Sequence, residues 1–495
     1  MLFLSAAQLP ALELNYYNQF NIGTKTLEFP GSYSQTGSDR KFVFSEPVKL
    51  RGGSYLYFDG ENRSPAIFRL GEEVYNLPAA EEPVRFVFFI ESDTVLRDFS
   101  LESSDSPIQF VSFSAEATLP ESSILTILFK GDALTIPTES ADYPFYLNFD
   151  SEQTETSENV ELTLDYEERE DVFGIRTRKG MNPYWFYKDA GDMSPSEISV
   201  RSNNAVLTKV QRSLEFPAET ALPSDLENVL YRDPSLWRQK GHEIYDWNDF
   251  PGMLIIDTAD YKVQSLFFKR LAFFTEKKIS AGELLSDEEL APLHGWNAHD
   301  YKAADLARFF NQAAKSDFAL NAREMELREI LISNGVLKET SGRLRPSGGG
   351  ILSISRESSD RLRYLFLTHE CYHGVFFSSD EFVASVTEIW NSLSDEERNF
   401  WRSFLDMYGY NVSDEYLLIN EFQAYLMQQK TEQADSYFRG KINWMLGIKP
   451  HLVGEMRSLL ANYGDTFTKS AQLVEDTAFS LTGIKAGDLV LKRKK

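Results

Sequence analysis

Residues 368–377 read THECYHGVFF, with two histidines four positions apart and a glutamate directly after the first. At 3.6 residues per helical turn, side chains four apart differ by about 40° around the axis, so His369 and His373 can bind one metal ion. Glu370 projects about 100° from His369 and can hold a water without binding the metal. The surrounding apolar residues recur at the steps of the same helix face, which predicts a helix over this region: Leu362, Leu365, Phe366, Tyr372 and Phe376.

The residues just before this helix give it a start. Ser358, Ser359 and Asp360 are good N-cap types, and ILSISR (351–356) is typical of a short strand. The glycines in RPSGGG (345–350) predict a flexible rim. The alternative for the pair is two buried histidines in a core helix, each with a hydrogen-bond partner.

A catalytic zinc ion needs a third protein ligand and an open position. In YLLINEFQAYLMQ (416–428), Glu421 interrupts an apolar helical stripe, and a buried carboxylate must be paired or bind a metal. We therefore predict Glu421 as the third ligand. Asp406, in LDMYGY (405–410), and Glu388 are the competing residues.

H-E-x-x-H on one helix followed by N-E-x-x-A on a later one resembles the gluzincin group of zinc metallopeptidases, the thermolysin-like arrangement. The resemblance covers about residues 350–430. It implies Zn²⁺ as cofactor and a peptide or protein as substrate, with ILSISR as the edge strand that pairs with the substrate. It implies His369, His373 and Glu421 as metal ligands and Glu370 as the general base.

The resemblance has limits in the residues themselves. The metzincin extension is missing, because Phe376 and Ser379 stand where Gly and His would be. LDMYGY resembles the aspzincin ligand motif but is one residue short. The thermolysin-like Asp four residues after the ligand Glu is replaced by Tyr425. We therefore expect Asp380, Glu381 or a backbone carbonyl to orient the imidazole.

A donor to the substrate carbonyl is also expected, and Tyr425, Tyr410, Tyr416 and His451 are candidates. The sequence does not distinguish among these four residues, and we take Tyr425 as the predicted catalytic donor. Two further histidines in HGWNAHDY (294–301) lie five apart, which does not align on a helix. That segment is either a loop near a substrate cleft or a plain surface loop.

Composition bounds the class of protein. A length of 495 residues predicts two to four domains, and a net charge of -25 argues against a nucleic-acid surface. The lone Cys371 excludes an intrachain disulfide and a Cys-based zinc site. No run approaches the ~18 apolar residues of a transmembrane helix. The start MLFLSAAQLPALELNYY resembles the end of a secretory signal without a positive n-region, and favours an exported protein: periplasmic, cell-surface or secreted.

The rhythm of short strands divides the chain. Residues 1–23 form the signal-like segment. The pattern of residues 24–165 predicts a β-sandwich, in which SEQTETSENVE (151–161) is a loop or a boundary, and residues 166–245 have a mixed pattern. From residue 246 to 495 the pattern is α/β turning to mostly α, with an active-site core at 346–430. It opens on GMLIIDT (252–258), a strand suited to burial on both faces. The fold class is therefore a multidomain α+β protein with an N-terminal all-β sandwich and a zincin-like region.

The function predicted from these features is a zinc-dependent metallopeptidase. The alternative is a non-catalytic surface binding or adhesion protein that binds a glycan or another surface ligand through the sandwich and keeps a structural or degenerate metal site. The intact His369, Glu370 and His373 favour catalysis.

Overall fold

The computed structural model describes residues 216–489 continuously and, in the rest of the chain, mainly the strands given below. It divides the chain into two compact units, residues 1–215 with 491–495 and residues 216–490. The chain is a multidomain α+β protein, as the sequence predicts. The predicted signal-like segment lies outside the described residues except for β1 (Leu14–Tyr16). No helix in the described part of the chain is long and apolar enough to cross a membrane.

Every described element of the first unit is a β-strand. The short strands expected in this part of the chain are present, but β14 (Ser157–Tyr166) begins inside the segment expected to be a loop or a boundary. That strand pairs with its neighbours on both sides, so the chain does not change unit at residue 165. The nine-stranded sheet has the order β16 (Gly180–Phe186), β13 (Phe145–Ser151), β18 (Ala205–Gln211), β11 (Ile124–Leu128), β8 (Val84–Ile90), β5 (Ser54–Glu61), β10 (Gln109–Glu116), β1 and β2 (Thr26–Leu27).

Two further sheets complete the described part of this unit. Phe173 of one five-stranded sheet meets Phe186 of the nine-stranded sheet edge to face, with ring centroids 5.4 Å apart. Their orders are β3 (Gly31–Thr36), β4 (Asp39–Leu50), β9 (Thr94–Ser103), β6 (Ala66–Leu70), β7 (Glu73–Leu77), and β12 (Leu134–Pro137), β17 (Glu197–Ser202), β14, β15 (Arg169–Thr177), β26 (Lys492–Lys494).

Strand β26 returns to the first unit from the far end of the sequence. It pairs with β15 through Phe173 to Ile175. The Lys492 ammonium, although buried, donates to the Trp185 carbonyl at 2.9 Å and lies 4.3 Å from the Phe186 ring centroid. The first unit therefore includes residues from both ends of the described chain.

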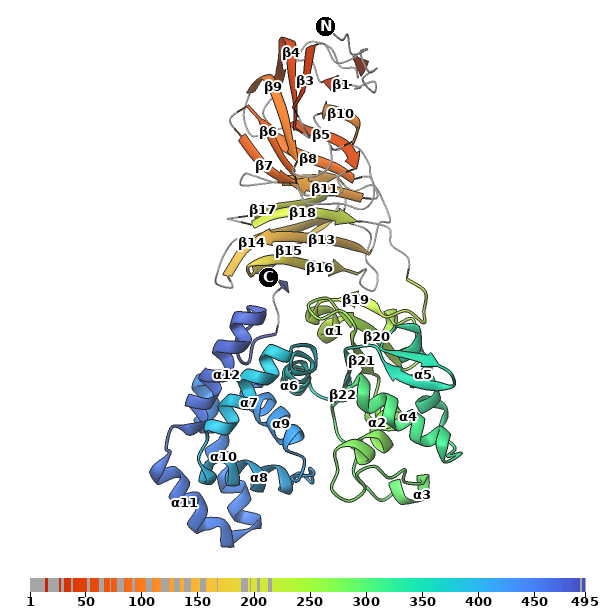
Figure 1. Cartoon of the computed structure of the whole chain (residues 1–495), viewed down its shortest axis with the longest axis vertical. Coiled ribbons are helices and arrows are strands. Elements are labelled where there is room, and N and C mark those ends of the chain that lie inside the picture. The colour runs from red at the N-terminus through yellow and green to blue at the C-terminus, as the bar shows by residue number, and fades with distance from the viewer. Residues whose placement is uncertain are drawn as a thin grey trace. The chain divides into compact units, whose positions relative to one another are not determined.

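The second unit is built on a five-stranded sheet with helices beside it (Figure 1). The predicted strand GMLIIDT is confirmed as β21, which is buried throughout. Because β20 shares this sheet, the unit starts before the expected boundary at residue 246. The sheet order is β19 (Leu222–Ser224), β20 (His242–Trp247), β21 (Met253–Thr258), β25 (Gly350–Ser355), β22 (His299–Lys302). The remaining α-helices and strands of this unit before residue 360 are α1 (Leu226–Tyr231), α2 (Tyr261–Thr275), α3 (Asp287–Leu290), α4 (Ala303–Lys315), α5 (Ala322–Ser333), β23 (Leu337–Thr340) and β24 (Arg343–Pro346).

After residue 360 the described chain is mostly helical. Figure 1 shows these helices as one group and the sheet with α2, α4 and α5 as another, in the same unit. Aromatic side chains fill the helical group; Trp401, for example, lies edge to face against Phe422 and Phe438. The helices are α6 (Asp360–Ser378), α7 (Asp380–Ser392), α8 (Asp395–Met407), α9 (Glu415–Met427), α10 (Ala434–Ile448), α11 (Val453–Asn462) and α12 (Thr466–Thr482).

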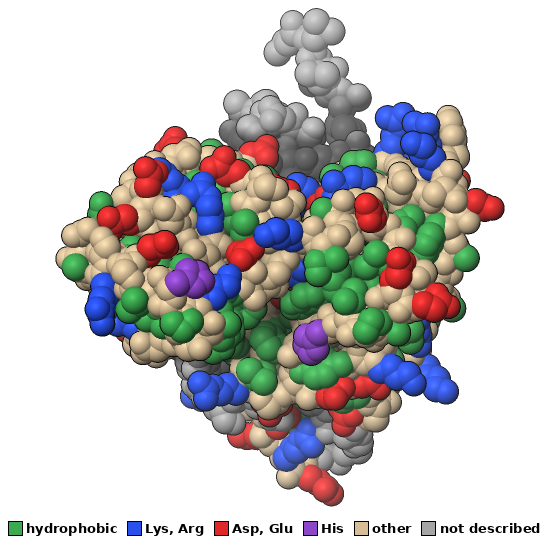
Figure 2. Space-filling model, turned by 90° about the horizontal axis from the view of Figure 1, so that it is seen from below, with side chains coloured by type: hydrophobic (Ala, Val, Ile, Leu, Met, Phe, Trp, Pro, Cys, Tyr) green, Lys and Arg blue, Asp and Glu red, His purple; other side chains and the backbone are tan. Residues whose placement is uncertain are grey.

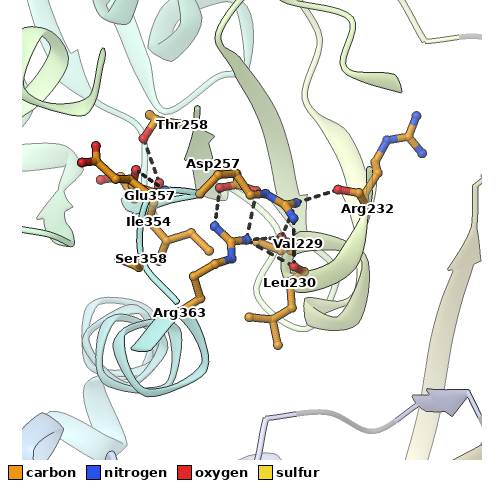
Figure 3. A network of polar contacts seen from close by, with 12 residues as sticks. Val229, Leu230, Arg232, Asp257, Thr258, Ile354, Glu357, Ser358 and Arg363 are labelled. Atoms are coloured by element: carbon orange, nitrogen blue, oxygen red, sulfur yellow. Dashed lines mark hydrogen bonds and ion pairs between the residues drawn. The ribbon is translucent and has the colours of Figure 1, made fainter. Parts of the chain in front are cut away.

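A buried ion-pair network ties α6 to the sheet (Figure 3). Arg363 of α6 donates to both carboxylate oxygens of Asp257 on β21, at 2.8 and 3.1 Å, and Arg356 donates to the same carboxylate at 2.6 Å. Arg363 also donates to the Val229 carbonyl at the end of α1. Arg363 is therefore buried, whereas Leu362, expected on the buried face, is 40% exposed. The first turn of α6 is oriented by this ion pair rather than by its apolar residues.

The glycines before β25 allow close backbone packing rather than a flexible rim. Gly349 has a φ of 66°, and an added Cβ there would collide with the Gly252 carbonyl. A Cβ on Gly350 would collide with the Tyr301 carbonyl of β22. These two positions bring β22 and β21 close to β25.

Candidate metal centre

The predicted histidine pair lies in the middle of α6, where the helix is buried. The Nε2 atoms of His369 and His373 are 3.1 Å apart, so both imidazoles face the same point. Burial lowers the pKa of His373 to about 4, partly offset by the negative charge of Glu421. A neutral imidazole is the form that binds a metal ion.

Helix α9 brings Glu421 to the same point. Its Oε2 lies 3.6 Å from His369 Nε2, and its Oε1 lies 3.8 Å from His373 Nε2. Burial works to raise the pKa of Glu421, but His373 and His369 outweigh it and leave the pKa below its ordinary value. One carboxylate and two imidazoles are a donor set that suits zinc.

An unsatisfied carboxylate oxygen supports the fit of these residues to a metal ion. Glu421 Oε2 is buried without a hydrogen-bond partner among the described residues. Burying such groups unpaired costs free energy, and a cation between the imidazoles and the carboxylate would recover part of it. One ligand atom each from His369, His373 and Glu421 lie within 4.8 Å of one another.

Asn420, the residue before Glu421, lies beside the second histidine. A hydrogen bond between its side chain and His373 favours the charged imidazole and raises the pKa, although burial dominates. Asp380 and Glu381, expected in this orienting role, are exposed in the first turn of α7. Neither acid therefore orients the imidazole, and His373 Nδ1 has no hydrogen-bond partner among the described residues.

Glu370 points to a second carboxyl group, that of Asp300 on β22. The two side chains hydrogen-bond each other, and Asp300 Oδ1 lies 3.7 Å from His373 Nε2. Burial, followed by the negative charge of Asp300, raises the pKa of Glu370 well above its ordinary value. Asp300, Glu370 and His373 form a second group whose ligand atoms lie within 4.8 Å of one another.

Strand β22, not ILSISR, is the edge strand beside the site. ILSISR forms β25, which lies between β21 and β22, so the expectation that it pairs with a substrate is wrong. The Ala303 N–H donates to the Gly349 carbonyl, which makes Lys302 and Gly350 a non-hydrogen-bonded pair. By alternation, the backbone groups of Asp300 and Lys302 point away from β25, toward the open edge.

An acid and a lysine after α2 lie close to these residues. Burial raises the pKa of Glu276 to about 7, against the opposing charge of Lys277. The Lys277 ammonium is 3.3 Å from Glu276 Oε2 and lies over the rings of Trp296 and Tyr410, at 4.0 and 3.7 Å. Asn411 N–H donates to the Glu276 carbonyl, which joins this segment to the chain after α8.

The candidate carbonyl donors lie in different surroundings. The Tyr425 ring centroid is 4.6 Å from that of His369, and its hydroxyl hydrogen-bonds the Tyr410 side chain. Tyr416 packs against Phe376 and under the Lys302 ammonium. His451 is exposed. Of these candidates, Tyr425 contacts a metal-binding residue directly, and Tyr410 contacts Tyr425.

The competing ligands lie elsewhere. Asp406 forms ion pairs with Lys278 and Lys449, each at 3.1 Å, and Glu388 is exposed. Neither belongs to a possible metal-binding group among the described residues, nor does the buried Cys371.

The HGWNAHDY segment contributes an acid to the site rather than a histidine. His294 is exposed, and His299 is buried with its Nδ1 3.0 Å from the Tyr301 hydroxyl. Asp300 was not predicted, because a single acid in a short polar segment far upstream carries no periodicity to mark it. Its position in the site follows from the pairing of β22 with β25, which the sequence pattern does not contain.

No family model and no curated protein matches this chain. A glycoside hydrolase 29 family member from an unknown rumen bacterium aligns with 8% identity and a TM-score of 0.12, over 37% of this chain and 40% of that chain. A structure of Sulfolobus Turreted Icosahedral Virus aligns with 13% identity and a TM-score of 0.14, over 40% of this chain and 99% of that one. Scores this low identify neither fold nor function.

Proposed function

We propose that this chain is a zinc-dependent metallopeptidase whose metal ligands are His369, His373 and Glu421. The observation that carries the proposal is the convergence of two imidazoles and one carboxylate from α6 and α9, with their ligand atoms within 4.8 Å of one another. When bound, zinc supplies Lewis-acid polarisation of a carbonyl group and lowers the pKa of water. Three protein ligands leave coordination positions open for a water molecule and a substrate carbonyl oxygen.

Glu370 acts as the general base. It sits between the two histidines on α6, is buried, and its Oε2 has no hydrogen-bond partner among the described residues. The carboxylate takes a proton from the attacking water and passes it to the leaving amine.

The open edge of β22 holds the substrate in an extended conformation. The outward backbone groups of Asp300 and Lys302 can pair with a peptide as an added antiparallel strand. Hydrophobic side chains gather around a depression in the middle of the face seen in Figure 2, which suits apolar peptide side chains.

The finer fold assignments belong to the same proposal. The contact between Phe173 and Phe186 supports sandwich packing of the sheets in the first unit, which would serve recognition or spacing. The sheet, α6 and α9 support a zincin-like second unit.

Elemental analysis of the purified full chain tests the proposal. We expect about one zinc per chain in the wild type, its loss in Glu421→Gln, and its retention in Asp406→Asn, a control that removes an acid outside the site. Peptide hydrolysis by the zinc-containing protein should fall about 10²- to 10⁴-fold in Glu370→Gln. A wild type that takes up no zinc on reconstitution, or activity unchanged in Glu370→Gln, would refute the peptidase and leave a binding protein.

A further inference from the structure

Three large apolar side chains of the second unit are exposed, in two segments that lie next to each other. Ile279, in the segment after α2, is 78% exposed, and Trp444 and Ile448 of α10 are 41% and 57% exposed. Trp444 and Ile448 are four residues apart, so they lie on one face of the helix. Single exposed apolar residues are common, but a group of them on one surface indicates a binding partner.

An acid of α8, Asp406, joins the two segments. The ammonium group of Lys278, the residue before Ile279, forms an ion pair with Asp406 Oδ1 at 3.1 Å. The ammonium group of Lys449, the residue after Ile448, forms an ion pair with Asp406 Oδ2, also at 3.1 Å. Each exposed isoleucine is therefore the chain neighbour of a lysine that contacts the same carboxylate.

The charge of this surface is opposite to the net charge of -25 of the whole chain. Two ammonium groups share the single Asp406 carboxylate, which leaves one positive charge in excess. Lys441 donates to the Tyr408 hydroxyl at 2.9 Å and lies 5.9 Å from the Trp444 ring centroid, and its charge adds to the excess. The lysine–apolar surface, as we name it, consists of Lys278, Ile279, Lys441, Trp444, Ile448 and Lys449.

We infer that the lysine–apolar surface binds the interface of a membrane that contains anionic lipids. Trp is favoured at the level of the lipid headgroups, and exposed aliphatic side chains can enter the boundary of the acyl chains. An ammonium group has three N–H donors, so Lys278 and Lys449 can contact a lipid phosphate while they stay paired with Asp406. The segments 277–282 and 441–454 contain no Asp or Glu that would repel such a phosphate.

The binding is peripheral, since no helix in the described part of the chain is long and apolar enough to cross a membrane. Ile279 favours lipid over a protein partner, because a fluid bilayer needs no matching pocket for a side chain that is 78% exposed. The inference is independent of the proposed peptidase activity, because none of the six residues of the surface is a predicted metal ligand or catalytic residue.

Co-sedimentation of the full chain with vesicles tests the inference. The wild type should bind vesicles of phosphatidylcholine mixed with phosphatidylglycerol about 10- to 30-fold more tightly than vesicles of phosphatidylcholine alone. This difference is expected for two excess positive charges that contribute about 5-fold each. It should shrink as the salt concentration rises, because salt screens exposed charges.

Variants locate the binding surface. Trp444→Ser and Ile279→Ser should each weaken binding to the mixed vesicles about 5- to 10-fold through lost apolar contact, and Lys441→Gln about 5-fold through lost charge. Leu473→Ser, at a side chain of α12 that is 51% exposed, and Lys338→Gln, at an exposed lysine of β23, are the matched controls and should bind as the wild type does. Unchanged unfolding temperatures would show that the variants keep the fold.

Brominated lipids give a direct reading of contact, because they quench the fluorescence of a tryptophan that reaches the acyl chains. The quenching seen in the wild type should disappear in Trp444→Phe, which keeps an aromatic ring. Equal binding to both kinds of vesicle, binding to neither, or quenching that persists in Trp444→Phe would overturn the inference. Wild-type dimers that Ile279→Ser dissociates, without binding to vesicles, would make this surface an interface between two copies and would also overturn it.

Discussion

At the scale of single residues, the packing of Tyr425 against His369 gives a first prediction. Tyr425→Phe keeps the ring, so we expect the zinc content to stay and kcat for peptide hydrolysis to fall about 10²-fold through loss of a donor to the substrate carbonyl. Tyr416→Phe, at the contact with Lys302, is the matched control and should keep kcat. Equal kcat in wild type and Tyr425→Phe would remove Tyr425 from the catalytic residues.

His299 gives a prediction about pH. Burial, followed by the charge of Lys277, lowers its pKa to about 3, whereas the unfolded chain takes up the proton near the ordinary value of about 6.5. The unfolded state therefore binds more protons at acid pH, and stability present above about pH 6.5 is lost as the pH falls toward 3. Between pH 6.5 and 5 this single group should account for about 2 kcal/mol.

Urea unfolding at several pH values checks this. His299→Gln should show a shallower loss of stability with acid than the wild type, and His294→Gln, at an exposed histidine of the same segment, should follow the wild type. Identical pH slopes in wild type and His299→Gln would contradict a neutral buried imidazole.

The sequence marks some of these residues better than others. His369 and His373 follow from helical spacing, and Glu421 follows from being the one acid on an apolar stripe; the structure brings all three together. Asn420 and Asp300 could not be predicted, because an amide on a helix and an acid on a short strand are ordinary until their neighbours are known. Leu362 shows the reverse: it is exposed, while Arg363 beside it is buried in an ion pair with Asp257, which the apolar pattern does not reveal.

At the scale of elements, the orientation of α6 depends on Arg363. Arg363→Met leaves Asp257 buried with one cation fewer, and we expect a loss of about 3–5 kcal/mol in the free energy of unfolding of the second unit. Weaker zinc binding should accompany it, because the helix that carries both histidines loses its tie to β21 and α1.

Urea unfolding followed by tryptophan fluorescence, with zinc titration of each variant, measures both effects. Arg361→Met changes an exposed residue on the same helical turn and should leave both unchanged. Equal destabilisation by the two variants would show that helix propensity, rather than the ion pair, matters here.

The strands illustrate what local sequence can predict and what it cannot. The short apolar runs at GMLIIDT and ILSISR are strands, as expected, because burial on both faces gives a continuous apolar pattern. Their order in the sheet is set by long-range pairing, which the pattern does not contain. ILSISR is not at the edge, because β22, a strand of only four residues, pairs with it there. The absence of a side chain at Gly350 allows the backbone of β22 to approach closely.

At the scale of the whole molecule, the pairing of β26 with β15 predicts an effect at a distance in sequence. Deleting residues 491–495 leaves one edge of β15 open and removes the Lys492 contacts, so the first unit should lose about 2–4 kcal/mol of stability. Zinc content should not change, because the metal-binding residues belong to the second unit.

Differential scanning calorimetry, which resolves the unfolding of separate units, is the measurement. Lys492→Met removes the contacts of the side chain but keeps the pairing of β26 with β15. It should lower the unfolding temperature of the first unit by less than the deletion does. A shift confined to the zinc-dependent transition would contradict the assignment of β26 to the first unit.

The same strand has a consequence for biosynthesis. A ribosome releases the chain from its N-terminus, so strands β1 to β18 emerge long before β26 does. The first unit must wait, with the edge of β15 uncovered, while residues 216–490 are made and begin to fold. An open edge of this kind attracts other strands, so a newly made chain is most exposed to mispairing during that interval, and slowing translation of the second unit should lengthen it.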